Sequence, residues 1–458
     1  MTISSRIGIL CFLWIFMSIS GVHASLPSRT EIVNPRRNET FDKNGRARKR
    51  KQGGNPRIIA KCLAFSGSMD GNRQVDPQIA VGGGYVLHAT NNGLIIYDKK
   101  GNYVNGIRQS CFNGGIDPKL FFCVNNKVFG FDFWDPWDNA KNKPVNISVS
   151  ETSDPNGAWN TYPVSIPNGR DGGGIGHSTK WIGYSFPGGP EQTFVLKMSE
   201  AKAGLPVTIY HFKDNLGQPA FNQDDNEILY FLKITSKNFI LSLVKDSGDG
   251  TPVTEQIIKP HNLTYIRFPP NSPQKGTSIK TASGDRNPKN LVLQGGFLWF
   301  SHTVNHKGRS AVQWHQLRLD GSIVQSGLIA NPHSNYIQTT LAVNKRNDLL
   351  IGFQETNKNM FISPRMTLRL ANDPPGMTRK IISLGEGQGA TSGTAWGDYS
   401  GSVIDGDNLL DLWTIQSITD KRGKGDTIIV KVPYRRKNRQ QSASRQKNLH
   451  LKPPENRD

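Results

Sequence analysis

Cysteine is scarce in this chain, and the spacing of the few that occur excludes several kinds of site. The sequence has 4 cysteines among 458 residues, without a CxxC pair or an interleaved pattern of histidine and cysteine. A structural zinc site or a dithiol redox motif built on those spacings is therefore not expected. Cys11 falls in the expected leader, which leaves Cys62, Cys111 and Cys123. Two interpretations stay open: Cys111 and Cys123 bridge neighbouring strands, or all three are buried thiols.

Long apolar runs are missing beyond the N-terminus. The run Ile7–Ile19 follows Arg6 and precedes the short sequence Val22-His23-Ala24. A basic residue, a short apolar run and small residues at the end are typical of a secretory signal peptide. The run is short for a membrane span, and the sequence has no second candidate. We therefore expect residues 1–24 to be a leader, with no transmembrane anchor, and the mature protein to be secreted, periplasmic or on the cell surface.

Long helical periods are also missing, whereas turn-forming residues are abundant. The chain has 47 glycines and 27 prolines, and only 36% of its residues are hydrophobic. Many short apolar runs separated by Gly, Pro, Asn and Asp are typical of β-strands joined by tight turns. This composition predicts an all-β protein with a distributed core.

A strand–turn–strand pattern recurs along the chain. Asp76–Val81 is followed by three glycines and Tyr85–Leu87, and Leu291–Leu293 is followed by two glycines and Phe297–Phe300. Repeats made only of strands, at roughly fixed spacing, are typical of β-propeller blades. The pattern predicts a single propeller over residues 58–432 with seven blades, and six blades as the alternative. The seven units are expected to start near Asp76, Asp117, Gly174, Asn226, Asn287, Tyr336 and Asp398.

The two ends of this domain are expected to close the ring. Ile58–Ala60 and Leu63–Phe65 have the composition of a first strand, and Thr427–Val432 that of the last. We predict that the first strand pairs with the final blade, because propellers protect their edges by such closure.

The net charge of +20 is concentrated in two polar segments outside this domain. Residues 25–57 carry ten basic and three acidic residues, and residues 433–458 carry eight and two. Segments with so few apolar residues are predicted to be a disordered linker and a disordered tail. They act either as solubilising segments or as a grip on an anionic partner, such as an acidic polysaccharide or a cell-envelope polymer. Nucleic acid is not expected as a partner, because the sequence contains no nucleic-acid-binding motif.

Several motifs spread over residues 76–432 carry a family resemblance. Trp396-Gly397-Asp398-Tyr399-Ser400, followed by Leu412–Gln416, is the most specific of them. Asp154–Trp159 resembles a degenerate Asp-box, with its glycine one place late. On these motifs the chain resembles the secreted, sialidase-like β-propeller proteins of bacteria. The resemblance implies a propeller fold and assigns no activity, since most members have none established.

The departures from active sialidases matter as much as the likeness. Three arginines for a sialic-acid carboxylate cannot be placed in the sequence, nor can a Tyr/Glu nucleophile pair. Sialidase activity is therefore disfavoured, and no catalytic residue is carried over from the family.

His177 is the first candidate for chemistry. When Ile175-Gly176-His177 is aligned with Ile79–Val81, His177 takes a position that is apolar in other units. A polar side chain in an apolar column needs a partner or a cavity. His177 is either a general acid/base lining the channel or a buried histidine bonded to a backbone carbonyl.

A second set of candidates would suit a polysaccharide lyase, by analogy with propeller-fold ulvan lyases. In such an enzyme an arginine neutralises a uronate carboxylate while a histidine or tyrosine moves the proton. The residues proposed for these roles, together with His177, are Tyr210, His211, Tyr265 and Arg267.

Other residues are candidates for ligand contact. Asp398 and Tyr399 are assigned to ligand binding, although Asp398 also recurs at a unit start as Asp76 does, which favours a turn role. His302 is a further ligand-binding candidate, and His302 with His306 would share a strand face if they bound a metal. A turn between them is the favoured interpretation, so no metal site is predicted. The segment Asp246–Gly250 is a weak calcium candidate and fits a hairpin turn better.

These observations favour a monomeric exported propeller that recognises an extracellular ligand, an anionic polysaccharide, without catalysis. Two alternatives remain open: a lyase acting on uronate-containing glycans, and an envelope protein that serves as a platform for protein contacts.

Overall fold

The regular structure of the protein is almost entirely β-strand, which confirms the all-β prediction. The computed structural model describes residues 23–38, 57–59, 62–67, 75–91, 93–112, 115–135, 144–166, 173–186, 192–263, 268–284 and 287–434. In these ranges helix is limited to α1 (Met198–Lys202) and the 3-10 turn η1 (Gln109–Phe112). Neither is long and apolar enough to cross a membrane.

The strands fall into successive antiparallel meanders, which are numbered here in chain order. The first meander consists of β6 (Gln78–Gly82), β7 (Tyr85–Thr90), β8 (Gly93–Asp98) and β9 (Tyr103–Arg108). The second consists of β10 (Ile116–Cys123), β11 (Val128–Trp134), β12 (Pro144–Ser150) and β13 (Trp159–Ser165). The third consists of β14 (Gly174–His177), β15 (Trp181–Ser185), β16 (Thr193–Lys197) and β17 (Val207–Phe212). The fourth consists of β18 (Gln218–Asn222), β19 (Leu229–Ile234), β20 (Asn238–Asp246) and β21 (Pro252–Pro260).

Three more meanders follow. The fifth consists of β22 (Leu291–Gln294), β23 (Phe297–His306), β24 (Arg309–Arg318) and β25 (Ile323–Ile329). The sixth consists of β26 (Asn335–Val343), β27 (Leu349–Asn357), β28 (Met360–Arg369) and β29 (Ile382–Ser383). The seventh consists of β30 (Gly401–Ile404), β31 (Leu412–Thr419) and β32 (Gly425–Val432), completed by β5 (Cys62–Ser66) and β4 (Arg57–Ile59).

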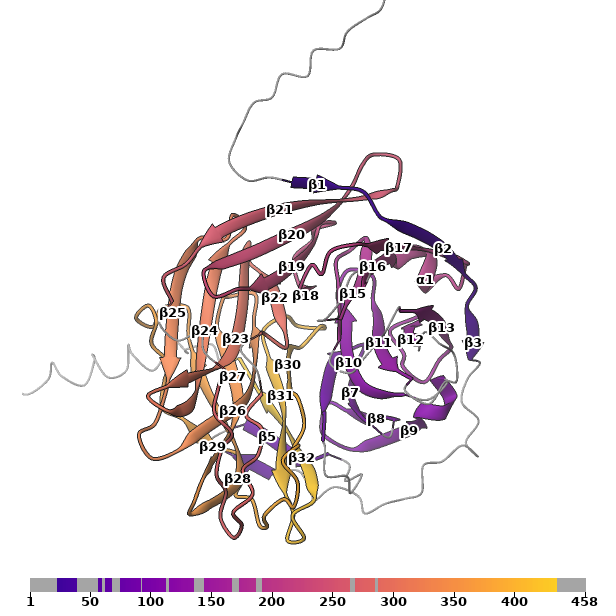
Figure 1. Cartoon of the computed structure of the whole chain (residues 1–458). Helices are drawn as coiled ribbons and strands as arrows, with labels where there is room; N and C mark the ends of the chain where they lie inside the picture. Colours follow the sequence, from indigo (N-terminus) through magenta and orange to yellow (C-terminus); the bar gives the residue numbers. More distant parts are fainter. Residues whose placement is uncertain are drawn as a thin grey trace, which may run out of the picture.

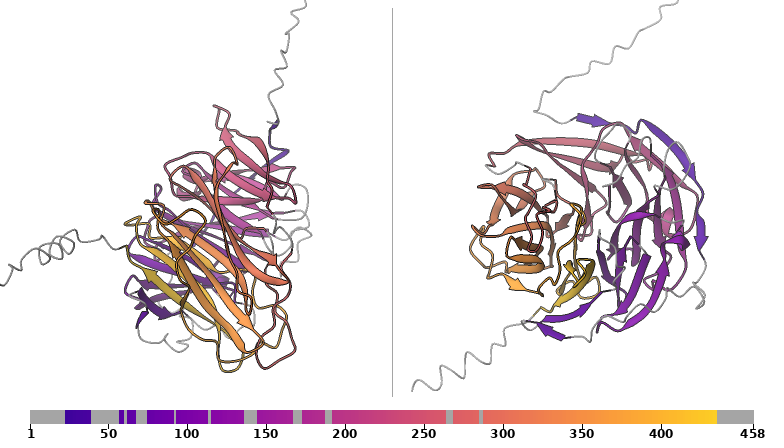
Figure 2. Two further views of the ribbon diagram at one scale, coloured as in Figure 1. Left: turned by 90° about the vertical axis from the view of Figure 1, so that its left-hand side faces the viewer. Right: turned by 60° about the horizontal axis from the view of Figure 1, so that its bottom comes forward.

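The first strands of the meanders stand next to one another around a common centre (Figures 1 and 2). Neighbouring first strands are in contact in chain order, and β30 contacts β6 to close the circle. β14 and β18, and β18 and β22, also share parallel hydrogen-bonded register. Ring closure also occurs through backbone pairing, because β32 pairs with β5 through Ile429–Phe65 and Val430–Ala64. This is the pairing that the sequence predicts for the two ends of the domain.

The hydrophobic core is distributed between meanders. One cluster packs the first meander against the second, including Leu87 and Phe131. Another packs the seventh against the first, including Trp413 and Val81. Each other pair of neighbouring meanders shares a cluster of its own. Burial of these apolar faces is the main stabilising term that holds the ring together.

The glycine pairs of the repeats have a structural role between meanders. Gly83 and Gly84 have φ values of 56° and 86°, and their amides donate to the Asp407 carboxylate of the seventh meander at 2.8 Å each. Gly295 and Gly296 donate in the same way to Asp224 of the fourth meander. Positive φ values favour glycine at these positions, and each carboxylate ties one turn to the neighbouring meander.

The segment before the ring is more ordered than its composition predicts. β1 (His23–Ser25), β2 (Arg29–Val33) and β3 (Arg36–Asn38) pair antiparallel with the outer strands β21, β17 and β13 (Figure 1). The prediction of a disordered linker over 25–57 is therefore wrong for residues 25–38. Disorder was inferred from the lack of apolar side chains, whereas these strands are held by backbone groups that an edge strand leaves open. Residues 39–56, and the tail after residue 434, lie outside the described residues.

The start of the fourth meander differs from the position that the sequence predicts. The fourth meander starts at Gln218 and not near Asn226, because Pro219 and the polar ends of β18 hide its strand pattern. The Asp154–Trp159 motif forms a turn in which the Asp154 Oδ1 accepts from the Asn156 amide at 3.0 Å, and the Trp159 ring is fully buried. The expected leader cleavage after Ala24 falls inside β1, and the leader itself stays a prediction.

Candidate functional site: the mouth of the channel

Lys119 lies at the centre of the ring, on the side where the first strands begin. Its Nζ, from β10 of the second meander, donates to the Lys289 carbonyl next to the fifth meander at 3.2 Å. A Cβ added at Gly174 of the third meander would lie 2.9 Å from the same Nζ. The ammonium thus bridges meanders on different sides of the channel, although the side chain is only 1% exposed. Sequence reasoning missed Lys119, although a lysine inside an apolar strand is the signal that singled out His177.

Tyr399 occupies the same axial position from the seventh meander. Its hydroxyl donates to the Pro118 carbonyl of the second meander at 2.9 Å, and Lys119 Nζ lies 4.9 Å from its ring centroid. Burial, followed by the nearby carboxylates of Asp117 and Asp76, raises the pKa of Tyr399 well above its ordinary value. Tyr399 is 1% exposed, which disfavours its predicted role in contacting a ligand. It stays protonated and ties two meanders together.

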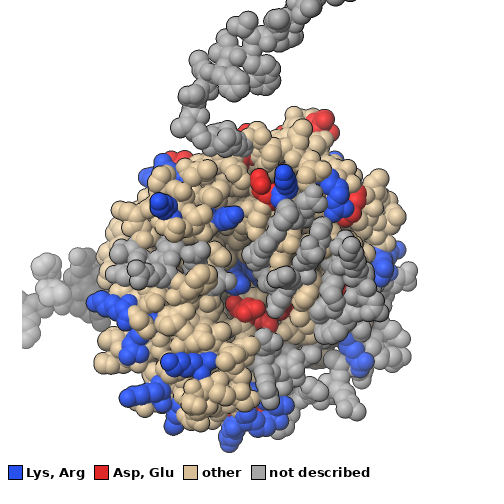
Figure 3. All heavy atoms as spheres, viewed as in Figure 1, with Lys and Arg blue, Asp and Glu red and all other residues tan. Residues whose placement is uncertain are grey.

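Carboxylates surround this axial pair. Asp76 accepts from the Asp398 amide at 2.6 Å and from Asn91 Nδ2 at 2.9 Å. Asp132 accepts from the Lys119 amide at 2.9 Å, and burial raises its pKa against the lowering effect of the Lys119 ammonium. Acidic side chains gather near the middle of the face drawn in Figure 3, beside a basic one. Among the described residues, buried charged side chains therefore occupy the centre of the ring below the mouth.

Two long connections deliver residues to this mouth, namely 268–284 and 384–400. Gln274 and Thr391 exchange hydrogen bonds across them at 3.1 and 2.9 Å. Trp396 Nε1 donates to Gln354 Oε1 at 3.0 Å, which fixes the second connection to the sixth meander. Asp398 and Tyr399 follow directly, so their positions depend on these anchors.

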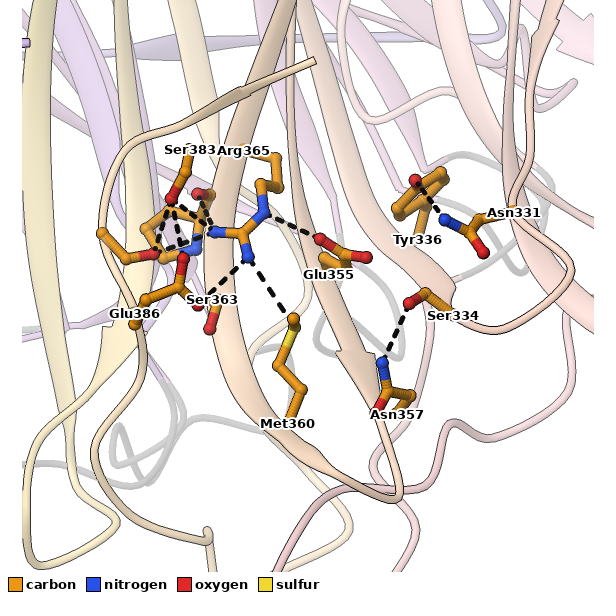
Figure 4. Close-up of polar contacts among 12 residues, drawn as sticks. Asn331, Ser334, Tyr336, Glu355, Asn357, Met360, Ser363, Arg365, Ser383 and Glu386 are labelled. Atoms are coloured by element: carbon orange, nitrogen blue, oxygen red, sulfur yellow. Dashed lines mark hydrogen bonds and ion pairs between the residues drawn. The ribbon is translucent and has the colours of Figure 1, made fainter.

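The start of the second connection is held by a buried arginine (Figure 4). Arg365 Nε donates to Glu355 at 2.8 Å, and its terminal nitrogens donate to the Gly385 carbonyl at 2.9 Å and to Glu386 at 3.1 Å. Figure 4 shows the guanidinium between the two carboxylates, with Tyr336 and Asn331 to one side. Because Arg365 already satisfies these groups, it serves as an anchor and has little capacity left for an external anion.

A small pocket opens between these connections and the strands below them. Every residue that lines it carries a polar side chain, except one glycine. Its volume of about 10 Å³ admits one water-sized group. The lining residues are Gly284, Asn287, Lys289, Ser301, His302, Thr303, Gln338, Thr339 and Asp398. Two sequence-predicted ligand residues, His302 and Asp398, are thus brought together here.

Gln338 is the unusual member of this pocket. It sits in a bulge of β26 with a φ of 49°, in the left-handed region that costs a residue with a side chain about 1–3 kcal/mol. Its Nε2 donates to the Gly397 carbonyl, while its Oε1 is buried without a hydrogen-bond partner in the described part of the chain. The positive φ and the unpaired acceptor both cost stability, so Gln338 is a candidate for contact with a ligand.

His177 does not line a site. Its ring packs 4.5 Å from the Phe121 ring and 6.2 Å from the Phe221 ring, between the first strands of three meanders. Both ring nitrogens are buried without hydrogen-bond partners among the described residues, and burial lowers the pKa of His177 to about 3. The proposed general acid/base role is therefore disfavoured, because the imidazole is neutral and sealed from solvent at neutral pH. The Ser178 backbone acts against this lowering of the His177 pKa without reversing it.

The remaining lyase candidates do not converge. His211 lies on the outer strand β17, where its Nε2 is 3.1 Å from Glu31 and 3.0 Å from Arg29 of β2. Three strand spacings of about 4.8 Å separate it from His177 on β14, or roughly 14 Å. Tyr210 is adjacent to His211 and so points to the opposite face of the sheet. Tyr265 and Arg267 lie outside the described residues.

His302 pairs with His315 and not with His306. The two Nε2 atoms are 3.2 Å apart in the buried space next to the fourth meander, and His315 Nδ1 lies 2.6 Å from Ser326 Oγ. Burial, with His302 and His261 nearby, lowers the pKa of His315 well below its ordinary value. Among the described residues no group of three or more His, Cys, Asp or Glu side chains could hold a metal.

The cysteine and calcium candidates have structural roles. Cys62, Cys111 and Cys123 are free thiols, so the possible Cys111–Cys123 bridge is not formed. Burial raises the pKa of Cys123 to about 11. In the segment Asp246–Gly250, the Asp246 carboxylate accepts from the Gly248 and Gly250 amides at 2.7 and 2.9 Å and also pairs with Lys180. These contacts make the segment the hairpin turn between β20 and β21.

No protein-family model matches this sequence, and no curated protein matches it. A protein of unknown function from Dyadobacter fermentans aligns over 91% of this chain and 100% of its own, with 11% identity and a TM-score of 0.38. An α-L-arabinofuranosidase from Clostridium thermocellum aligns over 69% and 96%, with 11% identity and a TM-score of 0.33. An ulvan lyase of a new polysaccharide lyase family aligns over 82% and 95%, with 10% identity and a TM-score of 0.34. These scores carry no argument about function, which has to come from the site.

Proposed function

We propose that the protein is an exported, non-catalytic binding module that recognises a hydroxyl-rich ligand, a glycan, on the face around the channel mouth. The observation that carries this proposal is the polar pocket with Gln338 at its wall. A strained residue with a buried, unused acceptor costs stability, and such costs cluster at ligand sites. A hydroxyl donated to Gln338 Oε1 would recover that cost.

The lining of the pocket suits sugar hydroxyls. Ser301, Thr303 and Thr339 have hydroxyl groups that can both donate and accept, and Asp398 is a partly buried residue with a carboxylate in the lining. Since the pocket admits one water-sized group, we propose that one hydroxyl enters it while the rest of the glycan lies across the face.

The charge around the axis bears on which glycan binds there. Asp76, Asp117, Asp132 and Asp398 surround Tyr399 closely enough to raise its pKa. These carboxylates outnumber the nearby ammonium groups of Lys119 and Lys289, which disfavours a uronate chain at the mouth. We therefore propose a neutral glycan at the mouth, in place of the anionic polysaccharide favoured by the sequence.

Catalysis is not part of the proposal. A lyase needs a base and a neutralising group at one place, whereas His177 and His211 lie on opposite edges of one meander. The described members of the predicted set thus support no common active site.

Calorimetric titration of the full chain with neutral and uronate-containing oligosaccharides tests the proposal. We expect a neutral oligosaccharide to bind, and Asp398→Asn or Gln338→Ala to weaken it by about 10-fold or more, the loss of roughly one buried hydrogen bond. Asp320→Asn, an exposed carboxylate in the β24–β25 turn, is the matched control and should bind normally. Binding that is the same in all variants would exclude this site.

A further inference from the structure

A second hollow of the protein lies away from the mouth, between the sixth and seventh meanders. It is a groove of about 920 Å³, which is at the upper end of the roughly 300–1,000 Å³ typical of small-molecule sites. Its walls come from the β26–β27 turn, the connection after β28, the ends of β31 and β32, and Cys62 of β5. We call this hollow the 6/7 groove.

The floor of the 6/7 groove is apolar. Leu349 and Leu412 are 0% and 3% exposed, and Leu368 and Val432 pack against the cluster that joins the two meanders. Cys62, 5% exposed, also belongs to that cluster. The groove is therefore an opening toward the core between the two meanders. An apolar group bound there would lose contact with water, which is energetically favourable.

The rim of the groove is cationic. Lys345 and Arg346 are exposed on the β26–β27 turn and form no ion pair with any described residue. By contrast, Arg379 is held by Asp373 at 2.7 and 2.8 Å. The Asp348 carboxylate accepts from the Ala371 amide at 2.9 Å and from Asn344 at 3.2 Å. The acidic groups of the rim are thus used internally, whereas two cations are left for an outside anion.

Tyr434 completes the rim on the other side. The Arg346 guanidinium lies 5.6 Å from its ring centroid, within the range of a cation–π contact. The Tyr434 amide donates to Asp411 at 2.8 Å, which fixes the backbone next to the groove. Arg346 is therefore placed above the groove by an aromatic ring without being neutralised.

We propose that the 6/7 groove binds a free single-chain anionic amphiphile such as a long-chain fatty acid. The acyl chain packs against the leucine side chains of the floor, which removes its apolar surface from water. The carboxylate lies between Lys345 and Arg346, which form charge-assisted hydrogen bonds with it. A bilayer is disfavoured as the source of the chain, because Leu349 and Leu412 at the bottom of the groove are almost fully buried and only Leu368 and Val432 are partly exposed. This site does not depend on the glycan site at the mouth.

Binding of palmitate to the full chain, measured by displacement of a fluorescent fatty acid, tests this inference. We expect palmitate to bind, methyl palmitate to bind at least 10-fold more weakly, and butyrate not to bind. The change Lys345→Glu with Arg346→Glu should weaken palmitate binding at least 10-fold, because it reverses the charge of an exposed turn. Leu368→Asn tests the floor and should weaken binding of the charged and the esterified chain alike.

Matched controls separate the possible outcomes. Lys213→Glu changes an exposed cation on another meander and should leave palmitate binding unchanged, as should Asp398→Asn at the mouth. Palmitate binding that survives the double charge reversal, or the absence of binding, would overturn the inference. Anionic phospholipid vesicles should bind equally to the native chain and to the double variant. Vesicle binding lost only in the double variant would mean that the rim meets a membrane instead of a free amphiphile.

Discussion

The channel axis and the 6/7 groove are built in opposite ways. At the axis, Lys119 and Tyr399 are each 1% exposed and reach across the ring to backbone carbonyls. At the groove, Lys345 and Arg346 are exposed and have no described ion partner. The charged and polar groups at the axis join meanders, whereas the two cations at the groove are exposed to solvent.

This difference shows that a charged residue in a repeat architecture can either join neighbouring meanders through buried hydrogen bonds or stay exposed at the surface. The seam between two meanders is where a groove opens, and the axis is where all the meanders meet. A site at the axis therefore has to be small and polar, while a site at a seam can reach the apolar core.

Lys119→Met should have the largest effect on stability. The change removes the ammonium that lowers the pKa of the buried Asp132 and that donates to the Lys289 carbonyl. Leaving buried polar groups without a partner costs about 1–3 kcal/mol, and more when the group is charged. Chemical unfolding measures the loss. Adding Asp132→Asn should restore part of it, while Lys345→Met on the groove rim should change stability by less than about 0.5 kcal/mol. Equal losses of stability in Lys119→Met and Lys345→Met would contradict the difference proposed between the axis and the groove.

His177→Phe should change how stability depends on pH. The folded pKa of His177, about 3, lies below the ordinary value of 6.5, so its contribution is complete above pH 6.5 and is lost as the pH falls toward 3. At pH 4 the native chain should have lost roughly 3 kcal/mol through this residue alone. The free energy of unfolding of His177→Phe, measured in urea at pH 7 and pH 4, should fall by roughly 3 kcal/mol less between these two pH values than that of the native chain. His333→Gln, a change at an exposed histidine, is the control and should keep the native pH dependence.

Glu31→Gln should have a smaller effect on stability, confined to β2 and the outer strand β17 with which it pairs. Glu31 accepts hydrogen bonds from Arg29 at 2.7 Å and lies 3.1 Å from the buried His211, which lowers its pKa. Loss of this charge should cost about 1 kcal/mol and make residues 26–35 more sensitive to limited proteolysis. Arg37→Ala, which removes an exposed ion pair with Glu151, should cost about 0–1 kcal/mol. If Glu31→Gln left proteolysis unchanged, the pairing of β2 would rest on its backbone alone.

The fold could be predicted in large part because the repeats carry it. The glycine pairs, the short apolar runs and the final strand Thr427–Val432 each have a local sequence pattern. β18 was misplaced because Pro219 interrupts its pattern. β1 to β3 could not be predicted, since their pairing is decided by open edges elsewhere in the ring and not by their own composition.

The site was harder to predict because it depends on which side chains the ring brings together. His302 and Asp398 were identified and do meet in the mouth pocket, although they are 96 positions apart in the sequence. Gln338 carries no local signal, because its strain arises from a bulge in β26. His177 was misinterpreted, since a polar residue in an apolar column marks a cavity or a buried group alike. The 6/7 groove needed the structure, because its floor and rim come from separate segments.

Calorimetric titration of the native chain and of Asp398→Asn with the same neutral oligosaccharides decides whether the mouth pocket binds a glycan. We expect saturable binding to the native chain that weakens about 10-fold or more in the variant, with no unsaturated uronate formed from acidic polysaccharides by the native chain. Equal binding by both proteins, no binding by either, or a rise in ultraviolet absorbance from a cleaved uronate would contradict it.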